Sequence, residues 1–366
     1  MGVFFIIILL LYISLIVKYF FGWKKNKESE NNYTPSVSIV IAMRNEEKEV
    51  ANLLLALKKQ LYPTDKLEFI LVNDHSTDTT LALLEQSNLT NLRVVSMPEG
   101  LFGKKNAIKK AVGIAKGEII LATDADCTFT PLWTKTMVSY FSNSEVKMVS
   151  GPVAYNKKGS VFQSLQTLEF LSLIGSGAGA IGNKNAIFCN GANMAYRKEV
   201  FLEVNNFEDD KAASGDDVFL LHSIKAKYQN SIAFAKDSDA IVLTDAVSSL
   251  KGFVNQRKRW TAKSSGYKDI ASIYTSFLVL FANLSLVVLF ILSFVSLDYF
   301  QVFGLFYLLK FLVDLLLLYL VLTFFNRKDL VKWVFPFELL YSFYIVLIVV
   351  LSFTKSFEWK GRTHKK

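Results

Sequence analysis

Two aspartates, Asp124 and Asp126, follow an apolar run in the segment "LATDADCTF" (121–129). Side chains alternate between the two faces of a β-strand, so both carboxylates point the same way if the extended conformation continues through Ala125. Two acids at the end of a buried strand carry a desolvation cost and repel each other unless a cation lies between them. Carboxylate oxygens suit Mg²⁺ or Mn²⁺, and an ion held by one or two carboxylates keeps open positions for phosphate oxygens. The pattern therefore predicts a divalent metal site that binds a phosphate-bearing ligand.

Other polar residues follow two further apolar runs. Asn45 and Glu46 come after "VSIVIAM" (37–43), and Asp74 ends "EFILVND" (68–74). Ligands of open α/β sheets bind at the carboxyl ends of the strands, so these side chains are expected at the same edge as Asp124. Each also has a structural interpretation, because Asn45 or Glu46 is suited to cap the next helix and Asp74 to begin a turn through "DHSTD".

Two more motifs lie in the second half of the chain. "ASGDDVFLL" contains Asp216 and Asp217 at the expected start of a helix, where the helix dipole favours negative charge and helix capping is one interpretation. "NQRKRW" places Gln256, Arg259 and Trp260 on one helical face. A basic interfacial helix with a tryptophan anchor, just before a membrane span, explains the second motif without any catalytic role.

The elements that must position these residues alternate between strands and helices. Four β-branched or aliphatic runs are typical of strands (37–43, 68–74, 92–97 and 118–124), and three intervening segments have helical periodicity (46–60, 77–86 and 104–116). This alternation predicts an α/β fold with a mostly parallel sheet and helices on both faces.

Membrane segments are predicted at both ends of the chain. Residues 3–17 carry no charge, and they extend through Trp23 if Lys18 snorkels. A cleaved signal peptide is the rival interpretation, but no basic start and no small-residue cleavage site accompany the segment. Three more apolar stretches occupy 277–297, 299–325 and 334–354, and lysines and arginines flank the first and separate the last two. The charge bias places the N-terminus outside and the central region in the cytoplasm.

The last apolar segment conflicts with the same charge rule. If it crosses the bilayer, the tail with Lys360, Arg362, Lys365 and Lys366 ends outside. Either this segment is re-entrant or interfacial, or the rule is overridden here. The net charge of +9 is largely topological, because basic residues flank the membrane segments and face anionic lipid, so no nucleic-acid partner is expected.

The predicted organisation has five parts. They are an anchor (1–23), a cytoplasmic catalytic domain (31–250), a basic interfacial helix (251–270), a membrane region of two to three spans (276–354) and a basic tail (355–366). "GSGAGAIG" (175–182) follows no clear strand and opens no clear helix, so it is not interpreted as a dinucleotide fingerprint. His75 and His222 lack metal-ligand spacing and are interpreted as surface or packing residues. Lys310 and Asp314 lie in an apolar span at helical spacing, which suits either function or a mutual ion pair.

Seven short motifs together resemble a known family. They are "PSVSIVIAMRNEE", "ILVNDHSTDTT", "GKKNAI", "LATDADC", "GANMAYRKEVF", "GDDVFLL" and "QRKRW". Their order and spacing resemble a membrane-bound glycosyltransferase of family 2 with the GT-A fold, over residues 35–260. Each motif is weak alone, and seven in order are strong.

The resemblance implies a nucleotide-diphosphate sugar donor and a divalent metal, Mg²⁺ or Mn²⁺. It assigns donor contacts to Asn45, Glu46, Asp74, Lys104 and Asp124, and it assigns the metal to Asp126 together with Asp124. Glycosyl transfer expels a nucleotide diphosphate, whose growing charge a metal neutralises.

The resemblance also implies the base and the acceptor contacts. An inverting transferase needs a carboxylate that takes the proton of the acceptor hydroxyl, and Asp217 is the expected base with Asp216 as its neighbour. The family's pair is usually Glu-Asp, so Asp216 in place of the glutamate leaves the choice between them open. Gln256, Arg259 and Trp260 match a motif near the acceptor and the diphosphate, and Gly191 and Asn193 of "GANMAYR" match the acceptor side.

The leading hypothesis is an integral-membrane, metal-dependent, inverting glycosyltransferase of the cell membrane, acting on a lipid or surface-glycan acceptor. A processive polysaccharide synthase is the closest alternative, and the "QRKRW" motif does not establish processivity. A non-catalytic membrane scaffold with the same fold is the alternative from another class, which the two intact acidic pairs argue against. A nucleotidyltransferase explains a metal-bound aspartate but not "QRKRW" after a second acidic pair.

Overall fold

The structure is a computed structural model that describes residues 2–29, 32–157, 159–204, 216–264, 266–352, 356–359 and 362–365, with the side chains of 216, 263 and 356–365 excepted. The chain divides into two compact units. One comprises residues 1–25, 157–183 and 246–366, and the other comprises 26–156 and 184–245. We call them the membrane unit and the catalytic unit, and each is described by itself.

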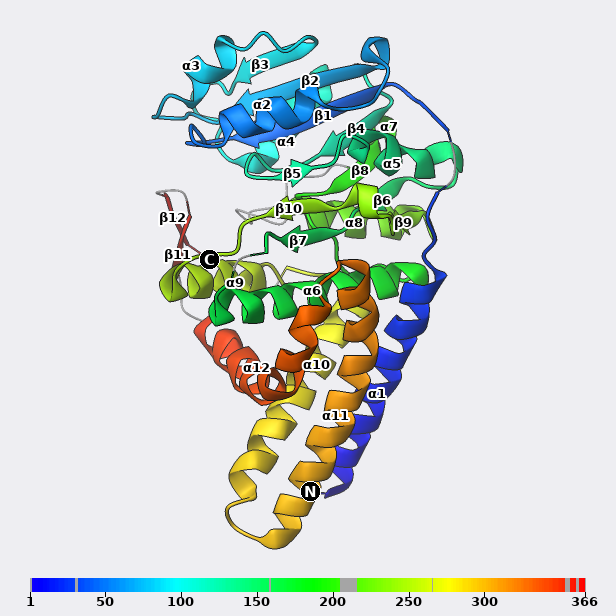
Figure 1. The fold of residues 1–366 in the computed structure, drawn as a ribbon, viewed down its shortest axis with the longest axis vertical. Helices are drawn as coiled ribbons and strands as arrows, with labels where there is room; N and C mark the ends of the chain where they lie inside the picture. Colours follow the sequence, from blue (N-terminus) through cyan, green and yellow to red (C-terminus); the bar gives the residue numbers. More distant parts are fainter. Residues whose placement is uncertain are drawn as a thin grey trace. The chain divides into compact units, whose positions relative to one another are not determined.

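The catalytic unit is built on a seven-stranded mixed sheet with the strand order β3-β2-β1-β4-β8-β6-β9 (Figure 1). Its strands are β1 (Val37–Met43), β2 (Leu67–Asn73), β3 (Leu92–Ser96), β4 (Ile119–Ala122), β6 (Met148–Ser150), β8 (Met194–Arg197) and β9 (Ile232–Phe234). Strands β1 to β4 pair in parallel, whereas β8 runs antiparallel to both β4 and β6. The predicted α/β fold class is confirmed, and the antiparallel β8 makes the sheet mixed.

Helices connect these strands, and a second, small sheet lies beside them. The helices are α2 (Val50–Lys58), α3 (Thr80–Glu85), α4 (Lys104–Ile114), α5 (Trp133–Ser139), α7 (Lys198–Val204) and α8 (Asp216–Lys227). The small sheet has the order β5 (Thr128–Phe129), β10 (Val242–Thr244), β7 (Val153–Tyr155). The interiors of β1, β2 and β4 are mostly apolar, as expected for parallel strands covered on both faces, and Ile39, Ile41 and Leu121 are completely buried. Strand β3 lies at the edge of the sheet and is partly exposed.

The membrane unit is helical. It comprises α1 (Gly2–Lys25), α6 (Val161–Gly182), α9 (Leu250–Ser264), α10 (Ile270–Leu292), α11 (Leu297–Phe324) and α12 (Val331–Ser352), followed by the hairpin β11 (Ser356–Trp359) and β12 (Arg362–Lys365). In the described part of the chain, four helices are long and apolar enough to cross a bilayer: α1, α10, α11 and the segment Lys328–Ser352. These are the four segments predicted from sequence, and α10 begins seven residues earlier than the apolar stretch 277–297 indicated.

Helix α6 was not predicted, and it changes the domain boundaries. Its last eight residues are the "GSGAGAIG" segment, which therefore lies inside a helix and not in a nucleotide-binding loop. A Cβ on Gly179 would stand 2.4 Å from the backbone oxygen of Tyr19 in α1, and one on Gly175 would stand 2.5 Å from Val321 in α11. The glycines thus allow α6 to pack closely against both helices. Residues 157–183 consequently belong to the membrane unit, which interrupts the predicted continuous domain of 31–250.

A cluster of charged side chains lies within the membrane helices. Lys310 is completely buried, and its Nζ donates to Asp314 Oδ2 at 2.8 Å and also to Glu338 of α12. The hydroxyl of Tyr12 in α1 donates to Asp314 Oδ1 at 2.8 Å. The mutual ion pair that the sequence allowed is present, and Glu338 and Tyr12 tie it to two further helices. Buried charges in lipid require such partners.

Helix α12 runs obliquely to the other apolar helices (Figure 1). It contains Pro336, and Glu338 reaches Lys310, which lies near the middle of α11. Only six residues later, the hydroxyl of Tyr344 donates to Glu169 of α6 at 2.7 Å, and α12 also packs against α9. Helix α6 contacts the last turns of α1 and α11. Because α12 starts just after α11 and later contacts α6, it returns to the side of the unit from which it starts.

Candidate active site

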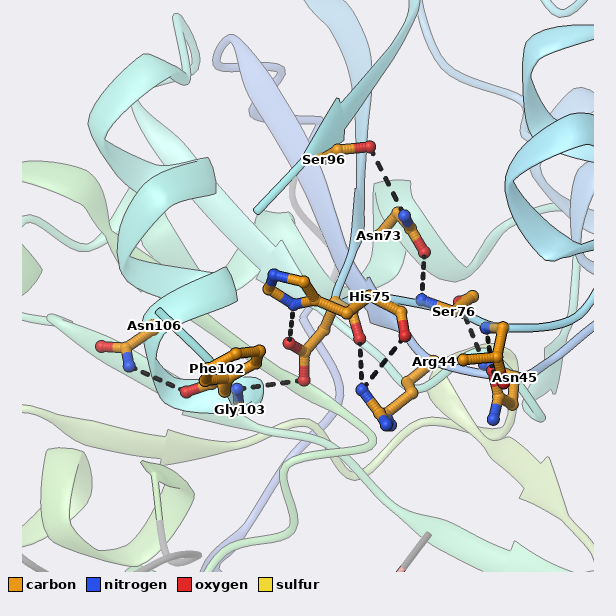
Figure 2. A network of polar contacts seen from close by, with 11 residues as sticks. Arg44, Asn45, Asn73, His75, Ser76, Ser96, Phe102, Gly103 and Asn106 are labelled. Carbon is orange, nitrogen blue, oxygen red and sulfur yellow. Dashed lines mark hydrogen bonds and ion pairs between the residues drawn. The ribbon is translucent and has the colours of Figure 1, made fainter. Parts of the chain in front are cut away.

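The loops after β1 and β2 are bonded to each other (Figure 2). Asn45 has a positive φ of 53°, and its side-chain oxygen accepts from the backbone N–H of Thr77 at 2.8 Å. The backbone N–H of Glu46 donates to Thr80 Oγ1 at 2.8 Å. Helix α2 begins after Glu49, so neither Asn45 nor Glu46 is its N-cap. The capping interpretation is wrong, and both residues instead shape the edge where ligands of such sheets bind.

Asp74 is the buried acid of this edge, with only 5% of its surface exposed. One carboxylate oxygen accepts from the backbone N–H of Gly103 at 3.0 Å, and the other bonds His75 Nδ1 at 3.0 Å. The turn after β2 is closed by Asn73, whose side-chain oxygen accepts from the N–H of Ser76 at 3.1 Å (Figure 2). The turn-forming role considered for Asp74 therefore belongs to Asn73. Asp74 holds the start of α4 in place.

His75 is more integrated than its sequence context indicated. It has a φ of 55°, it bonds Asp74, and its ring centroid lies 4.4 Å from that of Phe102 (Figure 2). Phe102 precedes Gly103, whose φ of 96° lets the chain enter α4. The interpretation of His75 as a packing residue holds for its contact with Phe102. Its bond to a candidate donor residue was not foreseen.

The geometry first expected for Asp124 and Asp126 is wrong. Strand β4 ends at Ala122 and a turn follows at Ala125, so the extended conformation does not continue between the two acids. Neither acid is deeply buried either, since the Asp124 side chain is 39% exposed and Asp126 is exposed. Their desolvation cost is correspondingly small. A cation does lie beside Asp124, because Lys104 Nζ is 2.5 Å from Asp124 Oδ1.

Asp217 of the second acidic pair and Lys104 both lie beside Gly191. Asp217 lies in the first turn of α8, is 9% exposed, and accepts from the N–H of Gly191 at 3.1 Å. A Cβ on Gly191 would stand 3.3 Å from Lys104 Nζ and 3.5 Å from Asp217 Oδ2. The fold thus brings together a candidate base, a candidate donor lysine and, through that lysine, Asp124. The side chain of Asp216 lies outside the described residues.

Asn193 lies close by but points into the protein. It is fully buried, its amide donates to the backbone oxygens of Pro152 and Ala240 at 2.8 Å each, and its oxygen accepts from Trp133 Nε1 at 3.0 Å. With these three bonds its side chain holds the loop that carries Gly191. Of the two acceptor-side residues expected in "GANMAYR", only Gly191 faces the other site residues.

Gln256, Arg259 and Trp260 lie in α9 of the membrane unit, and each is partly exposed. The helical conformation predicted for "NQRKRW" is confirmed. Arg257 of the same motif and Glu169 of α6 were not predicted as site residues, and they pair in the interior of this unit. A glutamate within an otherwise apolar and glycine-rich segment was the available signal for such a partner.

The residues present fit a divalent ion modestly. No group of three or more His, Cys, Asp or Glu side chains suited to a metal occurs among the described residues. Asp124 and Asp126 supply two carboxylates, and Mg²⁺ is usually bound by one or two carboxylates together with substrate phosphates. Burial, followed by the charges of Asp124 and Asp126, raises the pKa of the Cys127 thiol well above the ordinary value, which disfavours the reactive thiolate form.

Comparison with known proteins shows which family the chain is similar to. Residues 38–204, which extend from the second residue of β1 to the end of α7, match the family described as Glycosyl transferase family 2. Over this segment, which is slightly less than half of its length, the chain is similar to that family. The glycosyltransferase is 25% identical over 289 residues to a poly-beta-1,6-N-acetyl-D-glucosamine synthase of Staphylococcus epidermidis, covering 70% of this chain and 68% of the relative. It is 26% identical to the glycosyltransferase AglE of Haloferax volcanii, covering 56% of this chain and 65% of the relative.

A solved structure confirms the fold of the glycosyltransferase. The mannosyltransferase PcManGT from Pyrobaculum calidifontis, solved in complex with GDP-Man and Mn²⁺, aligns with a TM-score of 0.65 at 18% identity. The alignment covers 96% of this chain and 98% of that one. The shared architecture therefore extends through the membrane helices as well as the sheet. The recognition of a membrane-bound family 2 glycosyltransferase from seven motifs is confirmed.

Proposed function

We propose that this glycosyltransferase is a metal-dependent, inverting enzyme that moves a sugar from a nucleotide-diphosphate donor to a hydroxyl of a lipid or surface-glycan acceptor. One observation carries the proposal: Lys104 and Asp217 both lie beside Gly191, and Lys104 also pairs with Asp124, which follows the carboxyl end of the parallel strand β4. This places a cation for phosphate oxygens beside a carboxylate suited to accept a proton. The mannosyltransferase of the same fold was solved with GDP-Man and Mn²⁺, which supports this donor class.

Each side chain has a proposed part in the reaction. Asn45, Glu46 and Asp74 line the edge that receives the nucleotide, and Lys104 with Asp124 receives the diphosphate. Asp126 and Asp124 would hold Mg²⁺ or Mn²⁺, which when bound neutralises the charge of the departing diphosphate. Asp217 accepts the proton of the attacking hydroxyl, and its bond from the Gly191 N–H keeps its carboxylate in place. Gln256, Arg259 and Trp260 contact the acceptor or the diphosphate.

We further propose the orientation of the chain in the cell membrane. Lys24, Lys25 and Lys27 follow α1, which places the catalytic unit in the cytoplasm and the N-terminus outside. Helices α10 and α11 then cross out and back. Because α12 returns to α6 and α9, we place the basic tail on the cytoplasmic side, in agreement with the charge rule. This favours the re-entrant interpretation of the last apolar segment.

The second candidate is a processive synthase, and one observation favours it. The poly-beta-1,6-N-acetyl-D-glucosamine synthase of Staphylococcus epidermidis aligns over 70% of this chain. Both candidates use the same residues for donor and base, so they differ only in the number of sugars added per binding event. Analysis of product length with an excess of acceptor over donor distinguishes them.

The experiment that tests the proposed function uses purified protein in lipid with a panel of nucleotide sugars and Mn²⁺ or Mg²⁺. We expect nucleotide release with one donor, its loss after chelation of the metal, and its restoration by Mn²⁺. Asp217→Asn should lower transfer by about 10²-fold or more while donor binding remains, because only the base is removed. Asp126→Ala should weaken metal-dependent donor binding instead.

Asp65→Asn is the matched control, since Asp65 is exposed in a short helical turn before β2. It should transfer sugar at the rate of the unmodified protein. Transfer by Asp217→Asn at that same rate would show that the base is assigned wrongly. Failure of the intact protein to bind any nucleotide sugar, with or without metal, would refute the proposed function as a whole.

A further inference from the structure

Arg257 is the most deeply buried residue of the "NQRKRW" motif, with 2% of its surface exposed. Its guanidinium meets the carboxylate of Glu169 in α6, which is 5% exposed. Nε lies 3.0 and 2.9 Å from the two carboxylate oxygens, and Nη2 lies 2.6 Å from Oε2. This forked arrangement uses the planar geometry of arginine, which an ammonium group does not reproduce.

The same guanidinium lies close to two aromatic rings of α9. Its central carbon is 4.5 Å from the ring centroid of Phe253 and 4.3 Å from that of Trp260. These rings stand one helical turn before and one turn after Arg257, so all three side chains are neighbours on the helix, and both distances are within the range of cation–π contacts. The Trp260 ring also lies 6.0 Å from the ring of Phe170 in α6. The indole is therefore held by Arg257 on one side and by α6 on another.

Two further contacts complete this arrangement. Arg257 Nη1 donates to the side-chain oxygen of Gln256. On the far side of Glu169, the hydroxyl of Tyr344 in α12 donates to Oε1 at 2.7 Å. A continuous chain of contacts thus runs from α12 through Glu169 to Arg257, and from Arg257 to Gln256 and Trp260.

We infer that Arg257 is a positioning residue, pinned by Glu169 and Tyr344, which fixes the Trp260 indole and the Gln256 amide in the orientation that receives the acceptor. The inference rests on the proposed function, which assigns Gln256 and Trp260 to the acceptor. Arg257 itself is too deeply buried to meet a substrate. Its effect on the reaction passes through the two side chains that it touches.

The burial of the ion pair explains why a positioning role suits it. Removing two charges from water costs about as much as their attraction returns, so such a pair contributes geometry more than stability. Here the geometry is shared among three helices of the membrane unit, α6, α9 and α12. A substitution that preserves the charge but loses the planar fork separates positioning from simple charge pairing.

The test compares Arg257→Lys with the intact full-length protein in lipid nanodiscs, both labelled with fluorotryptophan. The chain has five tryptophans, and Trp260→Phe identifies the fluorine NMR resonance of Trp260. In Arg257→Lys we expect that resonance to shift or split, the acceptor KM to rise about tenfold, and the donor KM to stay unchanged. Lys251→Ala, which removes an exposed cation from the same helix, should leave all three unchanged.

A Trp260 resonance at its original position in Arg257→Lys would overturn the inference. If Arg257→Lys does not fold, Tyr344→Phe carries the same test, because it removes one hydrogen bond and leaves the ion pair. The fluorine spectrum needs no activity, so it separates this inference from the proposed function. An unchanged acceptor KM in Trp260→Phe would refute the acceptor assignment alone.

Discussion

At the scale of single residues, Gly191 determines how closely Asp217, the proposed base, and Lys104, the proposed donor lysine, approach each other. A β-carbon there would stand 3.3 Å from Lys104 Nζ, which must shift slightly, and 3.4 Å from Asp217 Cβ, which is an ordinary contact. The lysine end is flexible and moves at little cost, so Gly191→Ala should fold normally. The displaced lysine would change its geometry relative to Asp124 and to the proposed diphosphate position. We expect kcat/KM for the donor to fall about tenfold or more, measured by nucleotide release, because a small misplacement of a phosphate-binding group is costly.

Gly159→Ala provides the control for this substitution. A Cβ on Gly159 would meet no atom within 4 Å, so its kinetics should match those of the unmodified protein. Normal donor kinetics in Gly191→Ala would contradict the close approach of Lys104 and Asp217 on which the proposed site depends.

At the scale of elements, the packing of α6 on α1 depends on a glycine. A Cβ on Gly179 would lie 2.4 Å from the backbone oxygen of Tyr19, and backbone cannot move aside as a side-chain tip can. Gly179→Ala should therefore lower the stability of the membrane unit by about 1–3 kcal/mol, read as a lower thermal unfolding temperature in detergent. Tyr19, which also bonds Thr275 of α10, would be displaced with α1.

Gly304→Ala is the same substitution in another membrane helix, α11. A Cβ there meets nothing within 4 Å, and alanine is the better helix former by about 1 kcal/mol. We expect its unfolding temperature to be unchanged or raised. Equal unfolding temperatures for the two variants would show that α6 does not pack against α1 as closely as described.

At the scale of the whole molecule, the course of α12 sets the side of the C-terminus. The prediction uses single cysteines on a background in which the buried Cys127 and Cys189 are replaced by alanine. Val295→Cys, in the turn between α10 and α11, should react with a membrane-impermeant maleimide in intact cells. Thr363→Cys, in the tail, should react only after permeabilisation, because α12 returns to its side of entry. Labelling of Thr363→Cys in intact cells would mean that α12 crosses the bilayer.

The strands, the family and the membrane helices could be predicted from signals carried by neighbouring residues in the chain. Apolar runs that end in polar residues predicted the ends of β1 to β4 to within one or two residues. Seven motifs in order indicated the family. Uninterrupted apolar segments gave the membrane helices, because bilayer thickness fixes their length. These properties reside in consecutive residues, so no tertiary contact is needed to recognise them.

Only the tertiary structure decided which distant residues meet. The turn at Ala125, the assignment of α6 to the membrane unit, the Glu169–Arg257 pair and the return of α12 all depend on contacts between segments far apart in the chain. A glutamate within an apolar segment, or a row of glycines, indicates from the sequence that a packing partner exists. It does not show which helix supplies that partner, since packing geometry selects it from every segment that folds nearby.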